Sequence, residues 1–440
     1  MKIGFVSLGC SKNLVDTEVM LKRLADAGYT ITPDETEADI IVVNTCGFIQ
    51  SAKEEAIDNI LDVAWLKKNR ALKGIIATGC LVERYREQVL EEMPEVDAVL
   101  GTGSYHKIVE AVEAVARGEK YASFEDKNAA PLGGERIVTT PPYTAYLKVA
   151  EGCDNRCTYC AIPLIRGRMR SRRMEDVVAE AKSLEKIGVK ELNIIAQDTS
   201  RYGLDLYGKY MLPELVQKIL AETQIPWIRL LYLYPDKITD ELVAVIRDND
   251  RVCKYVDLPI QHVNDTVLAR MNRHGDGAVV RAAVEKIRRE IPGVTLRTTA
   301  IVGFPGETEA QFAELCEFVK DTGFDRFGAF TYSPEEGTPA AEFPDQIDEQ
   351  VKQDRYDTLM AVQLEVSEKK MQEKIGDVIE VLCEGYDPVA GVQYGRSRAD
   401  APDVDGKVYF TSAKKLPEGV FVNVKITKAL DYDLFGEAVR

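Results

Sequence analysis

Three cysteines that lie within eight residues of one another have the spacing of a metal-binding motif. The segment EGCDNRCTYCAIP contains Cys153, Cys157 and Cys160 directly after an apolar segment. A structural zinc site uses four protein ligands, and no fourth Cys or His lies nearby in the sequence. Three thiolates on a [4Fe–4S] cluster would leave one iron open to an exogenous ligand. We predict such a cluster here; the alternatives are a zinc site completed by a distant residue and buried, unligated thiols.

A second set of three cysteines is dispersed along the first 80 residues. Each follows a predicted strand, and the set comprises Cys10, Cys46 and Cys80. In an open parallel sheet the carboxyl ends of neighbouring strands share one edge, so these thiols are expected to converge. The adjoining glycines permit close backbone approach, and they are Gly9, Gly47 and Gly79. We predict a second cluster; the alternative is three small buried side chains.

Cysteine usage also indicates the compartment. The nine cysteines form an odd set in a chain whose start lacks the features of a signal peptide. Clustered cysteines in a reducing compartment are metal ligands or redox groups more often than disulfides. The remaining Cys253, Cys316 and Cys383 adjoin apolar patterns and are interpreted as core or incidental residues. No apolar run approaches the roughly 20 residues that span a bilayer, so we expect a cytoplasmic protein that does not contact membranes.

The net charge of −16 bears on the choice of partner. Proteins that bind phosphate backbones carry basic surfaces, so a nucleic-acid substrate is disfavoured although not excluded. A basic protein partner suits the overall electrostatic field better.

Alternating apolar and amphipathic segments predict an α/β fold of three parts. An open parallel α/β sheet domain is expected over residues 1–125, with strands at 3–8, 38–44 and 73–78 and helices at 14–28, 51–69 and 82–93. A polar linker, 125–142, leads to a partial (βα)6 barrel domain over 139–372. Short β-type runs over 373–440 predict a small all-β barrel.

The expected barrel has six strands separated by amphipathic helices and closed by one long helix at 348–376. The strands are predicted at 145–150, 191–197, 227–234, 254–260, 295–303 and 326–333. The cysteines of the first motif follow the first of these strands, and catalytic groups of such barrels lie at the carboxyl ends of strands.

This C-x3-C-x2-C motif resembles that of the radical S-adenosylmethionine superfamily. The resemblance implies that the open iron holds the amino and carboxylate groups of S-adenosylmethionine, whose reductive cleavage yields a 5′-deoxyadenosyl radical. Tyr159, which precedes the last cysteine, matches the same pattern. In AIVGFPGETE, the residues Gly303, Gly306 and Glu307 resemble the superfamily's cofactor-binding stretch; a tight structural turn is the alternative.

Further polar residues are candidates for the same site. The basic run RGRMRSRR, 166–173, could hold anionic groups through forked arginine contacts or could be a solvated helix start. Four residues at predicted strand ends could be catalytic or could only support other groups, and they are Gln197, Asp198, Gln261 and His262.

Both cysteine sets together resemble the methylthiotransferase family, over the whole chain, including a C-terminal TRAM domain. Four sequence segments are similar to those of its RimO branch, and they are SLGCSKNLVDTE, VVNTCGFI, IIAQDTSRYG and YCAIPLIRGRMRSR. That resemblance implies methylthiolation of the β-carbon of an aspartate in the twelfth protein of the small ribosomal subunit. It further implies two [4Fe–4S] clusters, of which the N-terminal one supplies sulfur, and S-adenosylmethionine as both radical source and methyl donor.

The sequence leaves two alternative functions open. One is a tRNA adenosine methylthiotransferase with the same chemistry, although acidic residues outnumber basic ones in 373–440 and a tRNA-binding tail should be more positive. The other is a non-catalytic iron–sulfur protein that binds RNA or ribosomes, which the open-iron motif at a barrel mouth disfavours. A radical enzyme of this family also implies an electron donor such as flavodoxin or ferredoxin.

Overall fold

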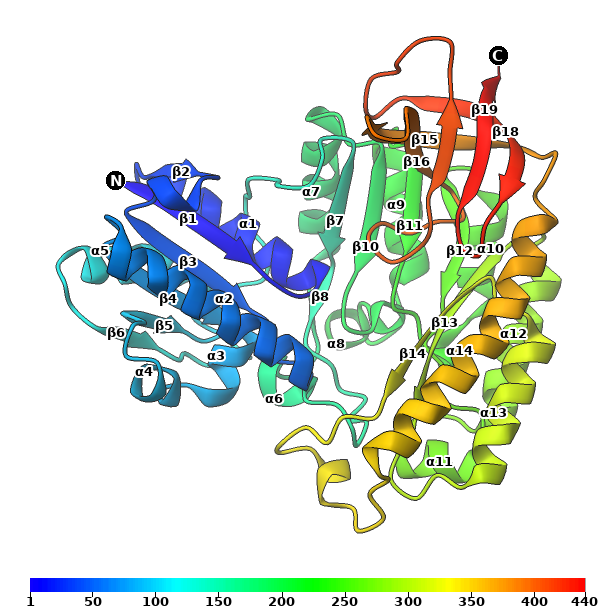
Figure 1. Ribbon diagram of the computed structural model, residues 1–440, viewed down its shortest axis with the longest axis horizontal. Helices are drawn as coiled ribbons and strands as arrows, with labels where there is room; N and C mark the ends of the chain where they lie inside the picture. The colour runs from blue at the N-terminus through cyan, green and yellow to red at the C-terminus, as the bar shows by residue number, and fades with distance from the viewer. Residues whose placement is uncertain (440) are drawn as a thin grey trace.

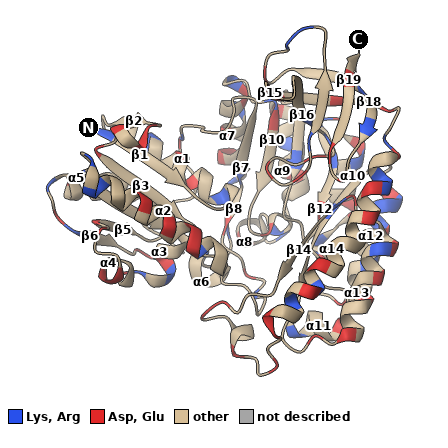
Figure 2. Ribbon diagram, in the orientation of Figure 1, with Lys and Arg blue, Asp and Glu red and all other residues tan. Residues whose placement is uncertain are grey.

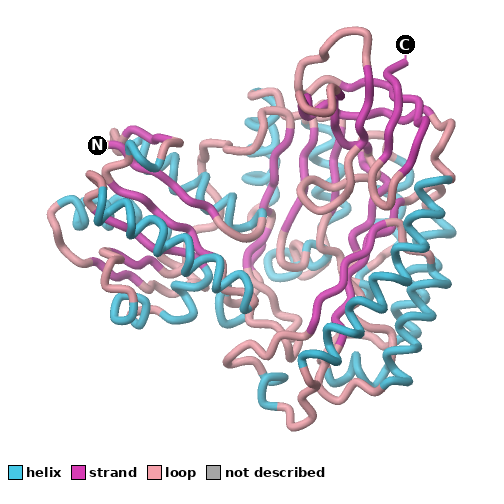
Figure 3. The backbone as a smooth tube through the Cα atoms, in the orientation of Figure 1, coloured by secondary structure: helices cyan, strands magenta, loops and turns pink. Residues whose placement is uncertain are grey.

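Three large β-structures follow one another along the chain (Figure 1). The computed structural model describes residues 1–439, which form an N-terminal α/β body, a central curved sheet and a C-terminal barrel. The tube trace separates the helix-covered first two parts from the all-strand third part (Figure 3). In the described chain, none of the helices has both the length and the apolar character needed to cross a bilayer.

The N-terminal body is a parallel sheet with the strand order β2-β1-β3-β4-β5-β6. Its strands are β1 (Lys2–Ser7), β2 (Thr30–Thr32), β3 (Ile40–Thr45), β4 (Gly74–Gly79), β5 (Ala98–Leu100) and β6 (Tyr121–Ser123). Its helices are α1 (Ser11–Asp26), α2 (Gln50–Asn69), α3 (Cys80–Tyr85), α4 (Gln88–Glu92) and α5 (Ile108–Ala116). Apolar residues of α1 and α5 cover one face of the sheet, and those of α2 to α4 cover the other.

The expected helix over 82–93 is wrong in its extent. The helix α3 already begins at Cys80, and the backbone of Arg86 has a φ of 49°. A non-glycine residue in this left-handed region cannot continue a right-handed helix, so α4 is a separate turn. The three-residue strands β2, β5 and β6 were not expected, because three residues are too few to show an alternating pattern.

The central sheet confirms the expected partial (βα)6 barrel. Six parallel strands lie in the order β14-β13-β12-β11-β10-β7, and the sheet does not close. They are β7 (Thr144–Lys148), β10 (Glu191–Ile195), β11 (Trp227–Leu230), β12 (Val252–Asp257), β13 (Thr295–Val302) and β14 (Arg326–Thr331). The main helices are α7 (Met174–Lys186), α9 (Leu212–Glu222), α10 (Asp240–Asp248), α12 (Gly277–Glu290), α13 (Glu309–Thr322) and the long α14 (Glu349–Gln372). Shorter elements are β8 (Ala150–Glu151), β9 (Arg170–Ser171), α6 (Ile162–Arg166), α8 (Leu204–Tyr207) and α11 (Asp265–Arg270).

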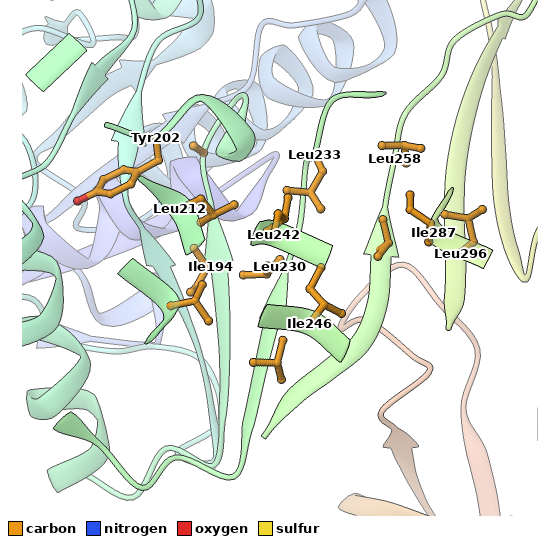
Figure 4. Close-up of a cluster of buried hydrophobic side chains, with 14 of the residues drawn as sticks. Ile194, Tyr202, Leu212, Leu230, Leu233, Leu242, Ile246, Leu258, Ile287 and Leu296 are labelled. Carbon is orange, nitrogen blue, oxygen red and sulfur yellow. The ribbon is translucent and has the colours of Figure 1, made fainter. Parts of the chain in front are cut away.

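Alternation along each strand separates an apolar outer layer from a polar inner face. Ile194 of β10 and Leu230 of β11 join the helix-covered core, together with Leu242 and Ile246 of α10 (Figure 4). Burying one such side chain contributes about 1.5–3 kcal/mol. The alternate residues, such as Arg229 of β11, point into the concave side of the sheet, where ion pairs satisfy them.

The C-terminal part confirms the predicted small all-β barrel, although Arg440 lies outside the described residues. It is closed in the order β15-β16-β17-β19-β18. The strands are β15 (Val378–Asp387), β16 (Val392–Ser397), β17 (Val408–Thr411), β18 (Phe421–Ala429) and β19 (Leu434–Val439). The rings of Trp227 and Phe421 lie 4.9 Å apart, and Tyr255 donates a hydrogen bond of 2.6 Å to Asp405. This barrel therefore covers the amino-terminal end of the central strands.

Glu191, the first residue of β10, is a fully buried carboxylate at this junction. It accepts hydrogen bonds from Arg229 at 3.0 Å and from Arg396 of the C-terminal barrel at 2.5 Å. Burial by itself would raise the pKa of Glu191, but the two guanidinium groups outweigh that effect and lower the pKa to about 2. The junction thus depends on a charged Glu191.

We expect Glu191→Gln to destabilise the protein by about 3–5 kcal/mol, because it leaves the buried Arg229 without a counter-charge and Arg396 paired only with Glu384. The stability that comes from ionised Glu191 is present above its ordinary pKa of 4.5 and is lost as pH falls from there towards about 2. Thermal unfolding of both proteins between pH 7 and 3 measures the difference, which should shrink in acid. The exposed Glu418→Gln is the control. An equal unfolding temperature for Glu191→Gln and wild type at pH 7 would contradict this role.

Candidate active site

The N-terminal cysteines converge at the carboxyl ends of neighbouring strands, as predicted. Cys10 precedes α1, Cys46 follows β3 and Cys80 opens α3. A Cβ atom added to Gly9 would lie 2.7 Å from the Cβ of Cys46, and one added to Gly47 would lie 2.6 Å from the backbone of Leu81. The two glycines therefore allow the three cysteine-bearing loops to touch.

The thiols of this trio differ in acidity. Burial raises the pKa of Cys80 to about 12. Burial also opposes ionisation of Cys10, but the charges of Lys12 and Arg166 outweigh it and lower the pKa of Cys10. Cys10 is an exposed residue. Burial also raises the pKa of Cys46, so the trio combines one thiol of lowered pKa with two of raised pKa.

The second trio lies in the loop that follows β7 and β8. The Sγ of Cys157 lies 3.2 Å from the hydroxyl of Tyr234, and the amide of Cys160 donates to the carbonyl of Cys157 at 3.0 Å. Burial raises the pKa of Cys153 to about 12 and that of Cys160 further. Thiols in such a setting ionise when a metal centre compensates the charge, so both trios fit the ligand chemistry of an iron–sulfur cluster.

Neither trio is arranged around a single ion. Within residues 1–439, no group of three His, Cys, Asp or Glu side chains could hold one metal ion. That the six cysteines ligate two clusters remains a prediction.

The two trios meet at the boundary between the N-terminal body and the central barrel. Cys80 packs against Ala161, the residue after Cys160, and against Ile165 of α6. Arg166, at the end of α6, lies 3.4 Å from the Sγ of Cys80. Loops that carry one cysteine of each trio are consequently in direct contact.

A cavity of about 570 Å³ opens at the same boundary. One wall is the segment after Cys46, which continues into the start of α2. The other wall includes Tyr159, beside Cys160, and the ends of β13 and β14. The lining residues are Phe48, Ile49, Gln50, Ser51, Glu54, Tyr159, Gln261, Thr299, Ile301, Phe330, Thr331, Tyr332, Ser333, Glu335 and Glu349. Tyr159 and Gln261, both candidates from the sequence, thus face a shared cavity.

A buried ion network fastens the two bodies together beside the cysteines. Asp16 of α1 pairs with Lys148 of β7 and with Arg166 of α6. Glu151, which also pairs with Lys148 at 2.7 Å and Arg166 at 3.3 Å, accepts a 2.6 Å hydrogen bond from Gln197. Burial opposes the ionisation of Glu151, but Lys148 and Arg166 outweigh it and lower its pKa to about 2. All four charged residues of this network are buried.

Three arginines of the basic run, 166–173, are engaged within the protein, whereas Arg168 and Arg173 are exposed. Arg166 is occupied by the ion network. Arg170 donates to backbone carbonyls of the linker, and Arg172 donates to the carbonyl of Lys148. The run forms β9 at 170–171, and its last residue, the exposed Arg173, directly precedes α7, as the alternative of a solvated helix start expects.

Three other candidates are engaged within the protein. Asp198 accepts hydrogen bonds from Asn155 and Ser200, and burial raises its pKa. His262 is buried 3.3 Å from Glu307, whose carboxylate also accepts from Arg355. These side chains support the loops in which they lie.

The glycine-rich loop after β13 is shaped by its neighbours. Gly303 and Gly306 have φ angles of 70° and 76°, and Cβ atoms there would lie 2.4 Å from Lys352 and 2.3 Å from Arg270. The amide of Gly303 donates to Glu307. The alternative of a tight turn is thus realised, while contact of these residues with S-adenosylmethionine remains a prediction.

The remaining cysteines lie away from both trios. Cys253 and Cys383 are buried in apolar clusters, and Cys316 packs partly against the core of the central barrel. Sequence reasoning missed Asp16, Lys148 and Glu151 as members of a buried ion network. The only signal of such a network was that polar residues occupy strand and helix positions where a core residue is expected.

Anaerobic reconstitution of the wild-type protein should yield about eight irons per chain, since each [4Fe–4S] cluster holds four. Replacing Cys10, Cys46 and Cys80 together by Ala should leave about four, and the same change at Cys153, Cys157 and Cys160 should also leave about four. Iron and sulfide analysis measures this, with Cys316→Ala as the control. Eight irons after either triple change would remove that trio as a ligand set.

Arg166→Met should destabilise the contact between the two bodies by about 3–5 kcal/mol, because Asp16 and Glu151 lose a buried counter-charge. Denaturant unfolding measures the change, and hydrogen exchange over residues 11–26 should show faster exchange. The exposed Arg168→Met serves as the control. Unchanged exchange in α1 would show that Arg166 does not hold the bodies together.

Comparisons with known proteins agree with this arrangement. Residues 2–101 match the family model described as "Uncharacterized protein family UPF0004", residues 147–319 match the radical SAM superfamily and residues 375–439 match the TRAM domain. A solved radical S-adenosylmethionine methyltransferase, TsrM from Kitasatospora setae, shares the fold with a TM-score of 0.57 at 14% identity, over 77% of this chain and 73% of that chain.

Full-length relatives are much more similar. The ribosomal protein uS12 methylthiotransferase RimO of Desulforamulus reducens is 50% identical over 100% of this chain and 99% of its own length. The protein of the same name from Geobacter sulfurreducens is 50% identical over 100% of this chain and 98% of its own length. Identity at this level over the whole of both chains, together with the match to the radical SAM superfamily, shows that the chain belongs to the RimO family of radical S-adenosylmethionine methylthiotransferases.

Proposed function

We propose that this protein methylthiolates the β-carbon of an aspartate in ribosomal protein uS12. The observation that carries the proposal is the meeting of the two cysteine trios beside one cavity of about 570 Å³. Two [4Fe–4S] clusters, one on each trio, and S-adenosylmethionine would supply the radical, the sulfur and the methyl group. Sulfur insertion needs the donor at contact distance from the reacting carbon, and the contact of Cys80 with Ala161 supports such an arrangement.

The chain's own residues define where the reaction would take place. Phe48 and Ile49 on one wall, and Tyr159 and Tyr332 on the other, contribute apolar and aromatic surface to the cavity. Gln261 adds a polar group, and its φ of 68° holds it in an uncommon backbone conformation at the barrel mouth. A cavity of this size accommodates a small cofactor together with one substrate side chain.

Charge supports a basic protein as the substrate. The chain carries a net charge of −16. Helix α2, whose first turn lines the cavity, bears acidic residues along its length (Figure 2), and they are Glu54, Glu55, Asp58 and Asp62. An acidic surface beside the reaction site attracts a basic ribosomal protein and repels a tRNA backbone.

We extend the proposal to the setting of the reaction. Residues 1–125 would carry the sulfur-donating cluster, 139–372 the radical-generating cluster, and 373–440 would form the TRAM domain. Flavodoxin or ferredoxin would deliver the electron. The reaction would take place in the cytoplasm, where ribosomal proteins are available.

The test is mass spectrometry of ribosomal protein uS12 from cells with and without the gene. We expect a methylthio group on one aspartate in wild-type cells and its absence in the deletion strain, with full recovery on complementation. Complementation with Cys153→Ala should fail, because one ligand of the predicted radical-generating cluster is lost.

The same cells provide the contradicting outcome. Unmodified uS12 in wild-type cells would refute the proposal, and loss of methylthiolated tRNA nucleosides in the deletion strain would assign the protein to tRNA. Cys316→Ala is the matched control, since this thiol is remote from both trios and should restore modification fully.

A further inference from the structure

Lys12 occupies an unusual position between the two bodies. It is the second residue of α1, two residues after Cys10, and only 8% of it is exposed. Its Nζ lies 3.2 Å from the centre of the ring of Tyr232, which follows β11 at the mouth of the central barrel. The side chain thus reaches out of the N-terminal body to the barrel.

The side chain of Lys12 has no carboxylate partner, although its charge acts on the Cys10 thiol and lowers the pKa of that group. Its buried neighbours Lys148 and Arg166 are both paired with Asp16 and Glu151. For Lys12, by contrast, residues 1–439 provide neither a carboxylate within 4.0 Å nor a hydrogen-bond acceptor. Of the whole residue, 8% remains exposed. Contact with an aromatic face offsets only part of the cost of desolvating an ammonium group, and an anion would complete the site.

The ammonium group of Lys12 lies between the segments that carry the two cysteine trios. Cys10 lies two residues before Lys12, on one side. On the other side, Lys12 touches Tyr232, and the hydroxyl of Tyr234 lies 3.2 Å from the Sγ of Cys157. Lys12 therefore lies between the segment that carries Cys10 and the segment that contacts Cys157.

We propose that Lys12 binds the side-chain carboxylate of the target aspartate and thereby selects aspartate as the substrate. The inference rests on the proposed function, since it assumes a carboxylate-bearing substrate. The β-carbon of aspartate is bonded directly to the carboxylate carbon, so an ammonium group that holds the carboxylate also fixes the reacting carbon. No covalent step involves Lys12; it contributes a charge-assisted hydrogen bond and keeps its protons.

The test compares wild type, Lys12→Met and Lys12→Arg as reconstituted holoenzymes. Met keeps the length of the chain and its contact with Tyr232 but removes the charge. The ligands are ribosomal protein uS12 and a variant in which the aspartate that wild type modifies is replaced by Asn. A charge-assisted hydrogen bond corresponds to roughly a tenfold or larger change in an equilibrium constant.

We expect wild type to bind the Asp form at least about tenfold more tightly than the Asn form, and Lys12→Met to bind both forms equally. Methylthiolation by Lys12→Met should fall by about tenfold or more, with partial recovery in Lys12→Arg. Iron content and the KM for S-adenosylmethionine in forming 5′-deoxyadenosine should match wild type. Lys22→Met, on the exposed side of the same helix, is the control and should behave as wild type.

Three outcomes would overturn the proposal. Loss of iron in Lys12→Met would show that Lys12 compensates the charge of the N-terminal cluster. A raised KM for S-adenosylmethionine would assign Lys12 to the cofactor's carboxylate. An unchanged preference for Asp over Asn would show that Lys12 does not read the substrate. Failure of wild type itself to modify uS12 would instead refute the proposed function, so the two are distinguishable.

Discussion

The buried ion network of Asp16, Lys148, Glu151 and Arg166 is the interaction on which the rest of the site depends. Charges removed from water are tolerated only when their partners lie at hydrogen-bonding distance, so this network has one favourable arrangement. It joins α1 to the start of the barrel, and Arg166 also touches Cys80. A displacement of either body would leave buried charges unpaired. The spacing between the two cysteine trios is therefore set by electrostatics and not by a covalent link.

The two ends of the central sheet have different tasks. The C-terminal barrel covers the amino-terminal end of the strands through Glu191, Arg396 and the rings of Trp227 and Phe421. The N-terminal body covers the carboxyl-terminal end, where the cavity lies. An open six-stranded sheet exposes a polar concave face, and docking at both ends supplies the ion pairs that this face requires. The additional domains thus complete the structure of an incomplete barrel.

Much of the architecture could be predicted because local patterns encode it. The alternation of strands with amphipathic helices predicts both parallel sheets, and the rule that strand ends share an edge predicts the convergence of Cys10, Cys46 and Cys80. The predictions that were wrong or missing also have local causes. The left-handed backbone of Arg86 divides a helical pattern that looks continuous, and three-residue strands such as β5 carry too little sequence to be recognised.

The sequence by itself determined the chemistry that is available: two sets of three thiols, their placement after strands and the glycines that let their loops meet. Only the tertiary structure decided which charges are used internally and which remain free. Arg166 lies in a run that resembles an anion site yet pairs with Asp16 and Glu151, whereas Lys12 has no carboxylate partner and lies against Tyr232. The reason is physical: an ion pair between residues more than a hundred positions apart forms only after two bodies dock, and no local pattern records that contact.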